Sequence, residues 1–367
     1  METAPQTSDT ETIAKAAAAQ ESPWRIFWRR LRAHRLAMVG AYILIVLYLT
    51  MVFAGFVAPY SDEWYDRSRV FHPPTGLTFQ GWRPAVKVYE PVRPGALKYR
   101  VVKGESRPIR FFVRGDSYKL LGLMRTDVHL FGTGDAANPV CLMGTDDYGR
   151  DIFSRLLYGS RISLTIGLIG ILITFSFGLA IGAASGFFGG LADDFLMRLS
   201  ELIMSIPGLY LIIALRAAFP PTMSSTMVYL MIMVILSFVR WAGTARVIRG
   251  MALSLRERPF VLAARTMGQT NTRIIWRHVL PNTFSYVVVA ATLSVPYYIL
   301  GEVVLSFLGV GVQEPQASWG NMLMDAQNPD HLVMYPWVLA PGAAIFLTIL
   351  AFNFLGDGLR DAVDTKS

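Results

Sequence analysis

Side chains that catalyse reactions or hold metals are few in this chain, and they are not grouped. The single cysteine, Cys141, excludes an internal disulfide and a cysteine-rich metal site. No two histidines stand three or four residues apart, so we expect no metal site; they are His34, His72, His129, His278 and His331. Gly-x-x-x-x-Gly-Lys-Ser/Thr, His-Glu-x-x-His and Gly-x-Ser-x-Gly are all absent from the sequence. The pattern predicts a protein that is not an enzyme and does not hydrolyse ATP itself.

Residues 257–268 have the pattern of a short amphipathic helix that contacts another protein. Its alanines are small enough for close approach, and its larger apolar side chains could enter a groove; these residues are Val261, Leu262, Ala263, Ala264 and Met267. Gly268 is the expected end of this helix, and Pro281 leads a second helix back to the apolar part of the chain. The alternative is a helix that only caps its own bundle.

Carboxylates stand at two further places of interest. Glu302 lies inside an apolar run, where an ionisable group is a candidate for a gate or a solute path, unless it pairs with a polar group on a neighbouring helix. Asp146, Asp147 and Asp151 lack the spacing of a calcium loop. We expect Thr145 or Asp146 to cap a short interfacial helix with a structural role.

Long apolar runs must position these residues. Hydrophobic residues make up 53% of the 367 positions and charged residues only 16%, compared with about 25% charged in soluble domains. Six runs are long enough to cross a bilayer as helices: residues 37–58, 162–188, 197–219, 222–239, 283–308 and 335–356. The second run is rich in glycine and alanine, which predicts close helix packing. The fold class predicted is an all-α polytopic membrane protein with six transmembrane helices.

The distribution of arginine predicts the orientation of these helices. Arginines cluster before the first run, and residues 246–277 contain seven more, whereas residues 220–225 and 309–334 contain no lysine or arginine. Because short cytoplasmic loops carry the basic residues of membrane proteins, both termini, residues 1–36 and 362–367, are expected in the cytoplasm. The formal charge of +8 is thus attributed to topology, and no nucleic acid partner is expected.

Residues 59–143 form a long polar segment after the first run. Short β-like stretches at 97–102, 108–113 and 128–131 predict a small, partly β extracytoplasmic insertion, with a long irregular loop as the alternative. Cys141 would lie on that outer side, where a membrane-impermeant reagent reaches it unless it is buried.

The arginine-rich segment resembles the signature loop of permeases of binding-protein-dependent ABC importers. The family pattern is Glu-Ala-Ala, three residues, Gly, nine residues, then Ile, any residue and Leu-Pro. Five positions match it: Ala263, Ala264, Gly268, Leu280 and Pro281. Leu262 replaces the family's Glu and removes a carboxylate from the expected contact with the ATPase, while His278 replaces Ile, as is common in the peptide branch.

Other stretches are similar to the dipeptide and oligopeptide branch of that family. They are residues 144–164, 305–309 with 318–320, and 352–361. The resemblance implies a core permease domain over residues 144–361, with five of the helices and a cytoplasmic coupling loop at 244–282. It also implies a multi-pass protein of the bacterial inner membrane that forms half of a translocation path for di- or oligopeptides.

The partners follow from the same resemblance. It implies a second homologous permease, two ATPase subunits (or one dimer) that carry the ATP and magnesium, an extracytoplasmic solute-binding protein and the lipid bilayer. This chain itself would bind no cofactor. Alternative cargoes are nickel complexes or glutathione-like solutes. The alternative outside the transporter class is a membrane-embedded sensor or enzyme.

Overall fold

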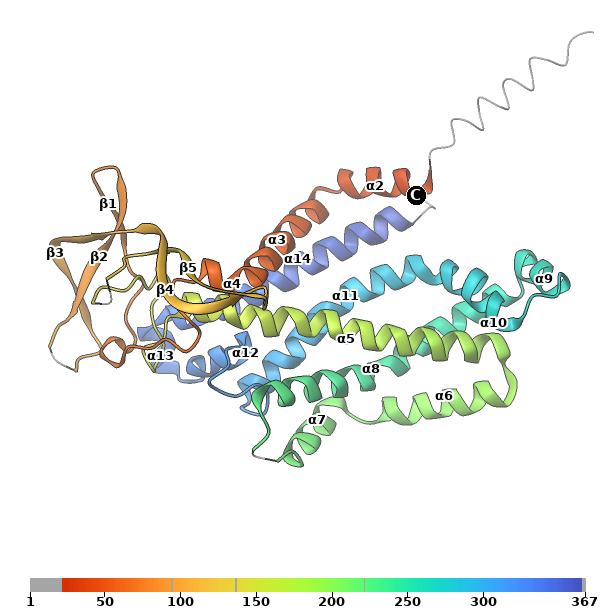
Figure 1. Cartoon of the computed structure of the whole chain (residues 1–367). Helices are drawn as coiled ribbons and strands as arrows, with labels where there is room; N and C mark the ends of the chain where they lie inside the picture. Colours follow the sequence, from red (N-terminus) through yellow and green to blue (C-terminus); the bar gives the residue numbers. More distant parts are fainter. Residues whose placement is uncertain (1–21, 94, 136, 221, 365–367) are drawn as a thin grey trace, which may run out of the picture.

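The computed structural model describes residues 22–93, 95–135, 137–220 and 222–364, and these form a long helical bundle with a β-rich end (Figure 1). Within these residues five helical stretches are long and apolar enough to cross a membrane. They are α3 (Arg35–Val52), α5 (Ile152–Phe188), α8 (Ser225–Arg256), α11 (Leu280–Phe307) with the short helices before it, and α14 (Ala340–Val363) with the turn before it. The polytopic helical fold is confirmed.

The run expected as the third span is divided between two helices. α6 (Gly190–Ser205) ends where Ile206 adopts an extended backbone, and α7 (Gly208–Ala217) begins after Pro207. The residue before a proline is driven out of the helical region, which explains the break. Six expected spans therefore correspond to five long helices and one broken pair.

Glycines bring α5 and α8 into close contact, as the small residues of residues 162–188 predicted. Gly178, Gly182 and Gly186 repeat at four-residue intervals along one side of α5. A Cβ built on Gly182 would stand 2.8 Å from the Cβ of Ile248, so no larger residue fits there. Close backbone approach of this kind is how helices pack in lipid, where the hydrophobic effect does not drive association.

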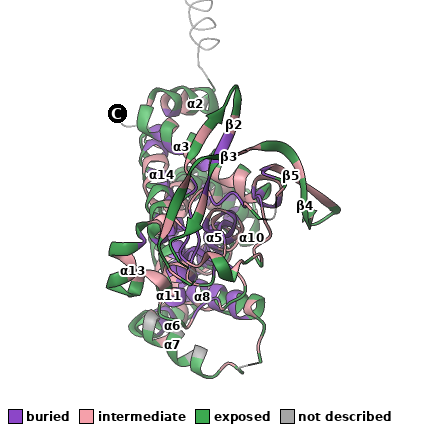
Figure 2. Cartoon of the chain, turned by 90° about the vertical axis from the view of Figure 1, so that its left-hand side faces the viewer, coloured by how far each residue is buried: buried purple, intermediate pink, exposed green. Residues whose placement is uncertain are grey.

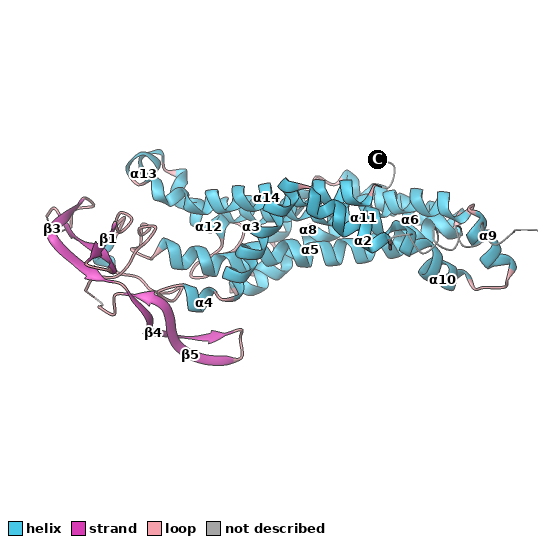
Figure 3. Cartoon of the chain, turned by 90° about the horizontal axis from the view of Figure 1, so that it is seen from above, coloured by secondary structure: helices cyan, strands magenta, loops and turns pink. Residues whose placement is uncertain are grey.

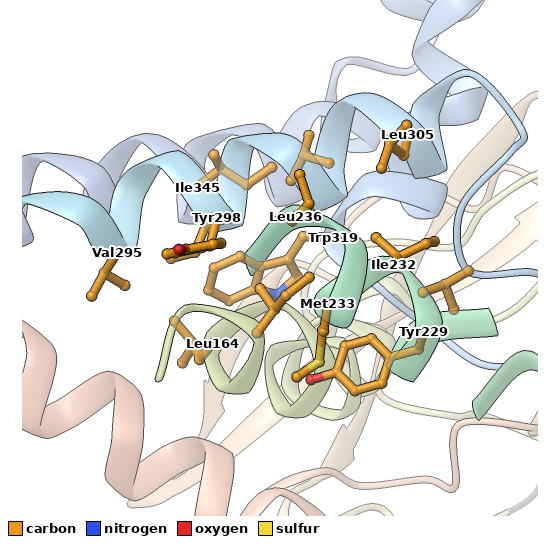
Figure 4. Close-up of a cluster of buried hydrophobic side chains, with 14 of the residues drawn as sticks. Leu164, Tyr229, Ile232, Met233, Leu236, Val295, Tyr298, Leu305, Trp319 and Ile345 are labelled. Carbon is orange, nitrogen blue, oxygen red and sulfur yellow. The ribbon is translucent and has the colours of Figure 1, made fainter. Parts of the chain in front are cut away.

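The main apolar core lies where α5, α8, α11 and α14 meet (Figure 4). Leu164, Ile232, Tyr298 and Trp319 are all buried at its centre. Trp319 belongs to α12 (Trp319–Met322), and its indole N–H donates to the Leu156 carbonyl at 3.0 Å. On α3, Leu44 packs into this core, while the other side of the helix carries exposed apolar side chains such as Tyr42, Ile45 and Leu49, which suits a helix that faces lipid on that side (Figure 2).

Part of the segment expected as an N-terminal tail is helical. α2 (Pro23–Ala33) packs beside the end of α14, where Leu31, Ala37, Leu359 and Ala362 form a small buried cluster. The Nδ1 atom of His34 accepts a hydrogen bond from the N–H of Ala37 and so caps α3. Residues 1–21, the rest of this expected cytoplasmic tail, lie outside the described residues.

The expected β insertion is present, and it is more regular than its sequence indicated. β1 (Leu77–Gln80), β2 (Arg83–Pro91) and β3 (Tyr99–Pro108) form an antiparallel sheet, and β4 (Arg110–Leu120) and β5 (Met124–Gly132) form a hairpin (Figure 3). The three β-like stretches overlap β3, β4 and β5, while β1 and β2 were not expected. η1 (Arg67–Arg69) precedes the sheets.

The insertion is packed onto one end of the bundle. The ring of Phe71 stacks on Tyr335 with centroids 4.2 Å apart, and the N–H of His72 donates to the Thr145 hydroxyl at 2.8 Å. The remaining short elements at this end are α4 (Ala54–Val57), η3 (Leu323–Gln327), α13 (Pro329–Met334) and η4 (Pro336–Leu339).

Candidate functional site

The predicted contact helix is present as α9 (Pro259–Thr266), at the end of the bundle opposite the β insertion (Figure 1). The chain then turns at Gly268, whose φ is +77°. The N–H of Gly268 donates to the Arg265 carbonyl, and the N–H of Gln269 reaches back to the Ala264 carbonyl at 3.2 Å. This is the glycine-terminated ending of a helix. α10 (Asn271–Ile274) and the π-turn η2 (Ile275–Val279) lead into α11.

One face of α9 is buried in its own chain. Val261 is 0% exposed and Ala264 is 1% exposed. They belong to a cluster that includes Phe187 at the end of α5 and Ile248 on α8. The expectation that Val261 enters a partner's groove is therefore wrong, because this side chain already fills the space between α9 and the bundle.

The opposite face of α9 is open. Leu262 is 42% exposed, Met267 is 71% exposed, and Ala263 also lies on this side. Phe260, 42% exposed, extends the apolar surface. The predicted docking residues thus divide into an inward pair and an outward set. A helical period of 3.6 residues produces this division.

The remaining positions of the predicted coupling loop, His278, Leu280 and Pro281, follow the turn after α9. The Nε2 atom of His278 is 3.3 Å from the Gln269 side-chain oxygen, and its ring lies 6.4 Å from that of Phe260. Leu280 and Pro281 form the first turn of α11. The helix is continuous through this point, since the N–H of Leu280 donates to the Ile275 carbonyl. Pro281 has no N–H to donate, and a local π-turn is one of the adjustments that accommodate a proline in a membrane helix.

An ion pair that the sequence did not single out ties α6 to α8 near the same end. Arg249 donates from Nε and Nη2 to the two Asp193 oxygens at 2.5 and 2.6 Å. Ser185 on α5 also donates to Asp193. Such a two-point pair fixes the orientation of both helices. Its members are 56 positions apart in sequence, so no local spacing could have indicated it.

Glu302 is fully buried and held by hydroxyl groups. Ser306, one turn along α11, donates to Oε1 at 2.7 Å, and Ser163 on α5 donates to Oε2 at 3.1 Å. Ser163 in turn accepts from the N–H of Trp319 at 3.1 Å. Among the described residues no lysine, arginine or histidine forms an ion pair with Glu302. The geometry fits the alternative, in which the carboxyl group pairs with a polar group on a neighbouring helix, here Ser163 on α5.

At the β-rich end, charged side chains connect the start of α5 to the segment after α11. Arg150 pairs with Asp146 at 2.6 Å and with Glu314 at 2.6 Å. Arg155, whose side chain is 2% exposed, donates to Glu314 at 3.0 Å. The expected cap at Thr145 or Asp146 is wrong. Asp151 caps α5 by accepting from the Ser154 N–H at 2.8 Å, and residues 144–151, all of which the structure describes, form no helix of their own.

A cavity of about 270 Å³ lies beside this network. Asp146, Asp147 and Asp325 line it, each with a carboxylate oxygen within 4.8 Å of the others. Arg150 already engages Asp146, so part of this negative charge is neutralised within the chain.

The sequence matches two family models. Residues 176–367 match the binding-protein-dependent transport system inner membrane component, and residues 22–74 match the N-terminal transmembrane domain of oligopeptide transport permease C. The chain therefore belongs to the family of inner membrane components of binding-protein-dependent transport systems.

Individual relatives are similar over much of the chain. The dipeptide transport system permease protein DppC of Bacillus subtilis (strain 168) is 34% identical over 340 residues, which are 92% of this chain and 84% of that protein. A putative peptide permease protein of Brucella suis biovar 1 (strain 1330) is 40% identical over 242 residues, 66% of this chain and 78% of that protein. A chain of the MetNI methionine ABC transporter, in an inward-facing conformation, is 18% identical with a TM-score of 0.41, covering 57% of this chain and 95% of that one.

Proposed function

We propose that this protein is the permease subunit of an ATP-driven importer of di- or oligopeptides. The observation that carries the proposal is the 34% identity to a dipeptide permease over 92% of the chain. The fold supports a transport role, because helices long enough to cross a membrane make up most of the bundle. The chain carries no phosphate loop, so ATP and its magnesium ion belong to separate ATPase subunits.

α9 is the proposed contact for one of those ATPase subunits. Its outward side chains, Phe260, Leu262, Ala263 and Met267, form a small apolar surface at the tip of the bundle. An apolar surface of this kind fits a hydrophobic groove. Leu262 replaces a carboxylate of the family pattern, so we expect this contact to depend more on apolar burial than on charge.

The inward face of α9 can pass a movement to the membrane helices. Val261 and Ala264 share one buried cluster with residues of α5, of α8 and of the turn before α11. Well-packed side chains transmit displacement because they leave no free volume. A push on α9 by the closing ATPase therefore acts on three helices at once. Movement of this kind would alternate the bundle between its inward- and outward-facing packings.

The rest of the assembly is proposed on the same basis. A second homologous permease completes the solute path, two ATPase subunits bind the α9 end, and an extracytoplasmic binding protein delivers the peptide at the β-rich end. The chain resides in the inner membrane of a bacterium with both termini in the cytoplasm. Residues 37–58, 59–143 and 144–361 are then the first span, the outer insertion and the core permease domain.

A matched pair of substitutions tests the role of α9. Ala263 is exposed and Ala264 is 1% exposed, so the same change at these neighbouring positions probes the two faces separately. Ala264→Leu overfills the cluster and should cost about 1–3 kcal/mol of stability. Ala263→Leu should leave the melting temperature unchanged, yet reduce the amount of ATPase subunit that co-purifies and the peptide-stimulated ATP hydrolysis in nanodiscs severalfold.

Two results would contradict the proposal. Unchanged ATPase binding and stimulation in Ala263→Leu would remove α9 as the contact. A purified complex without any ATP-hydrolysing subunit, or ATP hydrolysis that no peptide stimulates, would remove the peptide importer itself.

A further inference from the structure

The β4–β5 hairpin presents an apolar tip that the proposed transport mechanism does not use. Leu121 is 55% exposed, Leu123 is 85% exposed and Met124 is 66% exposed. Exposed apolar side chains gathered at one point of a protein usually mark a contact surface.

The backbone of the tip is strained. Leu121 has a φ of +53°, and Gly122 follows with +73°. Glycine or asparagine is the usual residue in a left-handed position, and another residue there costs about 1–2 kcal/mol. Because strain of this kind persists mainly at functional positions, a leucine at this point indicates that its side chain has a role.

The hairpin runs along the side of the bundle, away from the three-stranded sheet (Figure 3). Near its base, the ring of Phe131 lies 6.1 Å from that of Phe153, at the start of α5. Midway, Nδ1 of His129 is 2.6 Å from the Ala58 carbonyl oxygen, and the ring of Tyr118 lies directly against Gly55. The position of the hairpin is therefore fixed by contacts along its length.

The tip reaches the level of the membrane-spanning parts of α3 and α5. Leu121 and Gly122 share a cavity of about 530 Å³ with Met51, Val52 and Thr165. Thr165 lies 12 positions beyond Phe153 on α5, which corresponds to about 18 Å along a helix axis. It also lies beyond Arg161, the last charged residue before the uncharged run that starts at 162.

The side chains around the tip have the chemistry of a membrane surface. Lys119 and Arg125 pair across the two strands directly behind the apolar tip. On α5, Arg161 lies over the ring of Tyr158, with the guanidinium carbon 4.9 Å from the ring centroid. Cations and tyrosines are typical of the headgroup level, with apolar side chains beneath them.

The helix beside the tip continues this apolar surface. Leu49 is 53% exposed and Val52 is 36% exposed at the end of α3. In a family of inner membrane components, exposed apolar side chains on the outer side of a bundle face lipid. The tip therefore lies beside an apolar surface of the kind that faces lipid.

We propose that the β4–β5 hairpin dips into the lipid leaflet on the side of the insertion. Leu121, Leu123 and Met124 enter the boundary between headgroups and acyl chains, and Lys119 and Arg125 contact the headgroup phosphates. This second attachment fixes the orientation of the insertion relative to the membrane. The proposed lipid contact of the hairpin does not depend on which solute is transported.

Site-directed fluorescence on the full chain in lipid nanodiscs tests the proposal. A polarity-sensitive fluorophore is attached to Leu123→Cys, and Trp82→Cys serves as the matched control, because Trp82 is 100% exposed at the turn between β1 and β2. Cys141 is buried, so the unsubstituted chain is the labelling blank. Leu123 is exposed, and its replacement leaves the packing intact.

The expected result is a blue-shifted emission at position 123, quenched severalfold more by lipids with a quencher on the acyl chain than by aqueous iodide. The probe at position 82 should show the reverse. Leu121→Asn, which suits the left-handed backbone and removes an apolar anchor, should move the probe at 123 toward water. Equal iodide quenching at 123 and 82 would overturn the proposal. A blue shift without quenching by lipid would also overturn it, since protein would then cover the tip.

Discussion

At the scale of single residues, the ionisation of Asp147, a carboxyl group outside the long helices, depends strongly on its surroundings. Burial, together with the negative charges of Asp325 and Asp146, raises the pKa of Asp147 to about 7. The positive charge of Arg150, whose Nη2 atom lies 3.9 Å from Oδ1 of Asp147, opposes this shift. The folded protein therefore holds a proton on this group at pH values where the unfolded chain has released it.

This shift predicts how stability depends on pH. Between the ordinary pKa of an aspartate, about 4, and about 7, the native state binds more protons than the unfolded state, so stability falls as pH rises through this window. Asp147→Asn removes the cost of ionisation. It should raise the melting temperature at pH 8 by about 2 °C and leave it nearly unchanged at pH 4.

Differential scanning fluorimetry at both pH values checks the prediction, with Glu63→Gln at an exposed carboxylate as the control. A gain that is equal at pH 4 and pH 8 would contradict it, because the gain would then arise from packing or hydrogen bonding.

Residue-level roles were only partly predictable from sequence. The apolar surroundings of Glu302 indicated its burial, but its partner Ser163 on α5 lies 139 positions away in the sequence, so no local pattern could indicate it. Similarly, the pattern around α9 predicted a helix with one apolar side. Whether Val261 or Leu262 faces the bundle depends on where α5 and α8 end, which no local pattern contains.

At the scale of elements, the turn after α9 fixes the direction of the coupling segment. Gly268 has a φ of +77°, and no atom lies within 4 Å of where a Cβ would stand. The position thus requires glycine for its backbone and leaves space for a side chain. A substitution there changes the turn without creating a clash.

Gly268→Val is predicted to uncouple the ATPase while the membrane helices still insert. A β-branched residue in the left-handed region costs about 1–2 kcal/mol, which distorts the link between α9 and α10. Peptide-stimulated ATP hydrolysis in nanodiscs should fall severalfold, while Gly268→Asn, which tolerates this backbone, should retain most of it. Normal stimulation in the valine variant would argue against α9 as a lever.

Predictions of whole elements succeeded where an apolar run was long and uninterrupted. The long apolar runs at 162–188 and 283–308 are helical throughout most of their length. The run at 197–219 failed as one helix because Pro207 breaks it. β2 was missed because Pro84 and Pro91 lie at its ends, and strand pairing, which local sequence does not encode, determines that Val86 and Val88 are buried.

At the scale of the whole molecule, the two ends of the bundle have different chemistry. The β-rich end carries the insertion and the Arg150–Glu314 network. The α9 end carries the arginine-rich segment of residues 246–277. Basic segments remain in the cytoplasm, so the two ends must lie on opposite sides of the membrane if the proposed coupling is correct.

Labelling with a membrane-impermeant thiol reagent tests this orientation. Cys141 is unsuitable, because it is 0% exposed and burial raises the pKa of its thiol, which keeps it in the unreactive form. The unsubstituted chain should therefore be labelled only after denaturation. Trp82→Cys on the insertion should be labelled in intact spheroplasts, and Met267→Cys after α9 only once the membrane is permeabilised. If Met267→Cys reacted in intact spheroplasts, the coupling segment would face away from the cytoplasmic ATP, and an ATPase could not drive this permease through α9.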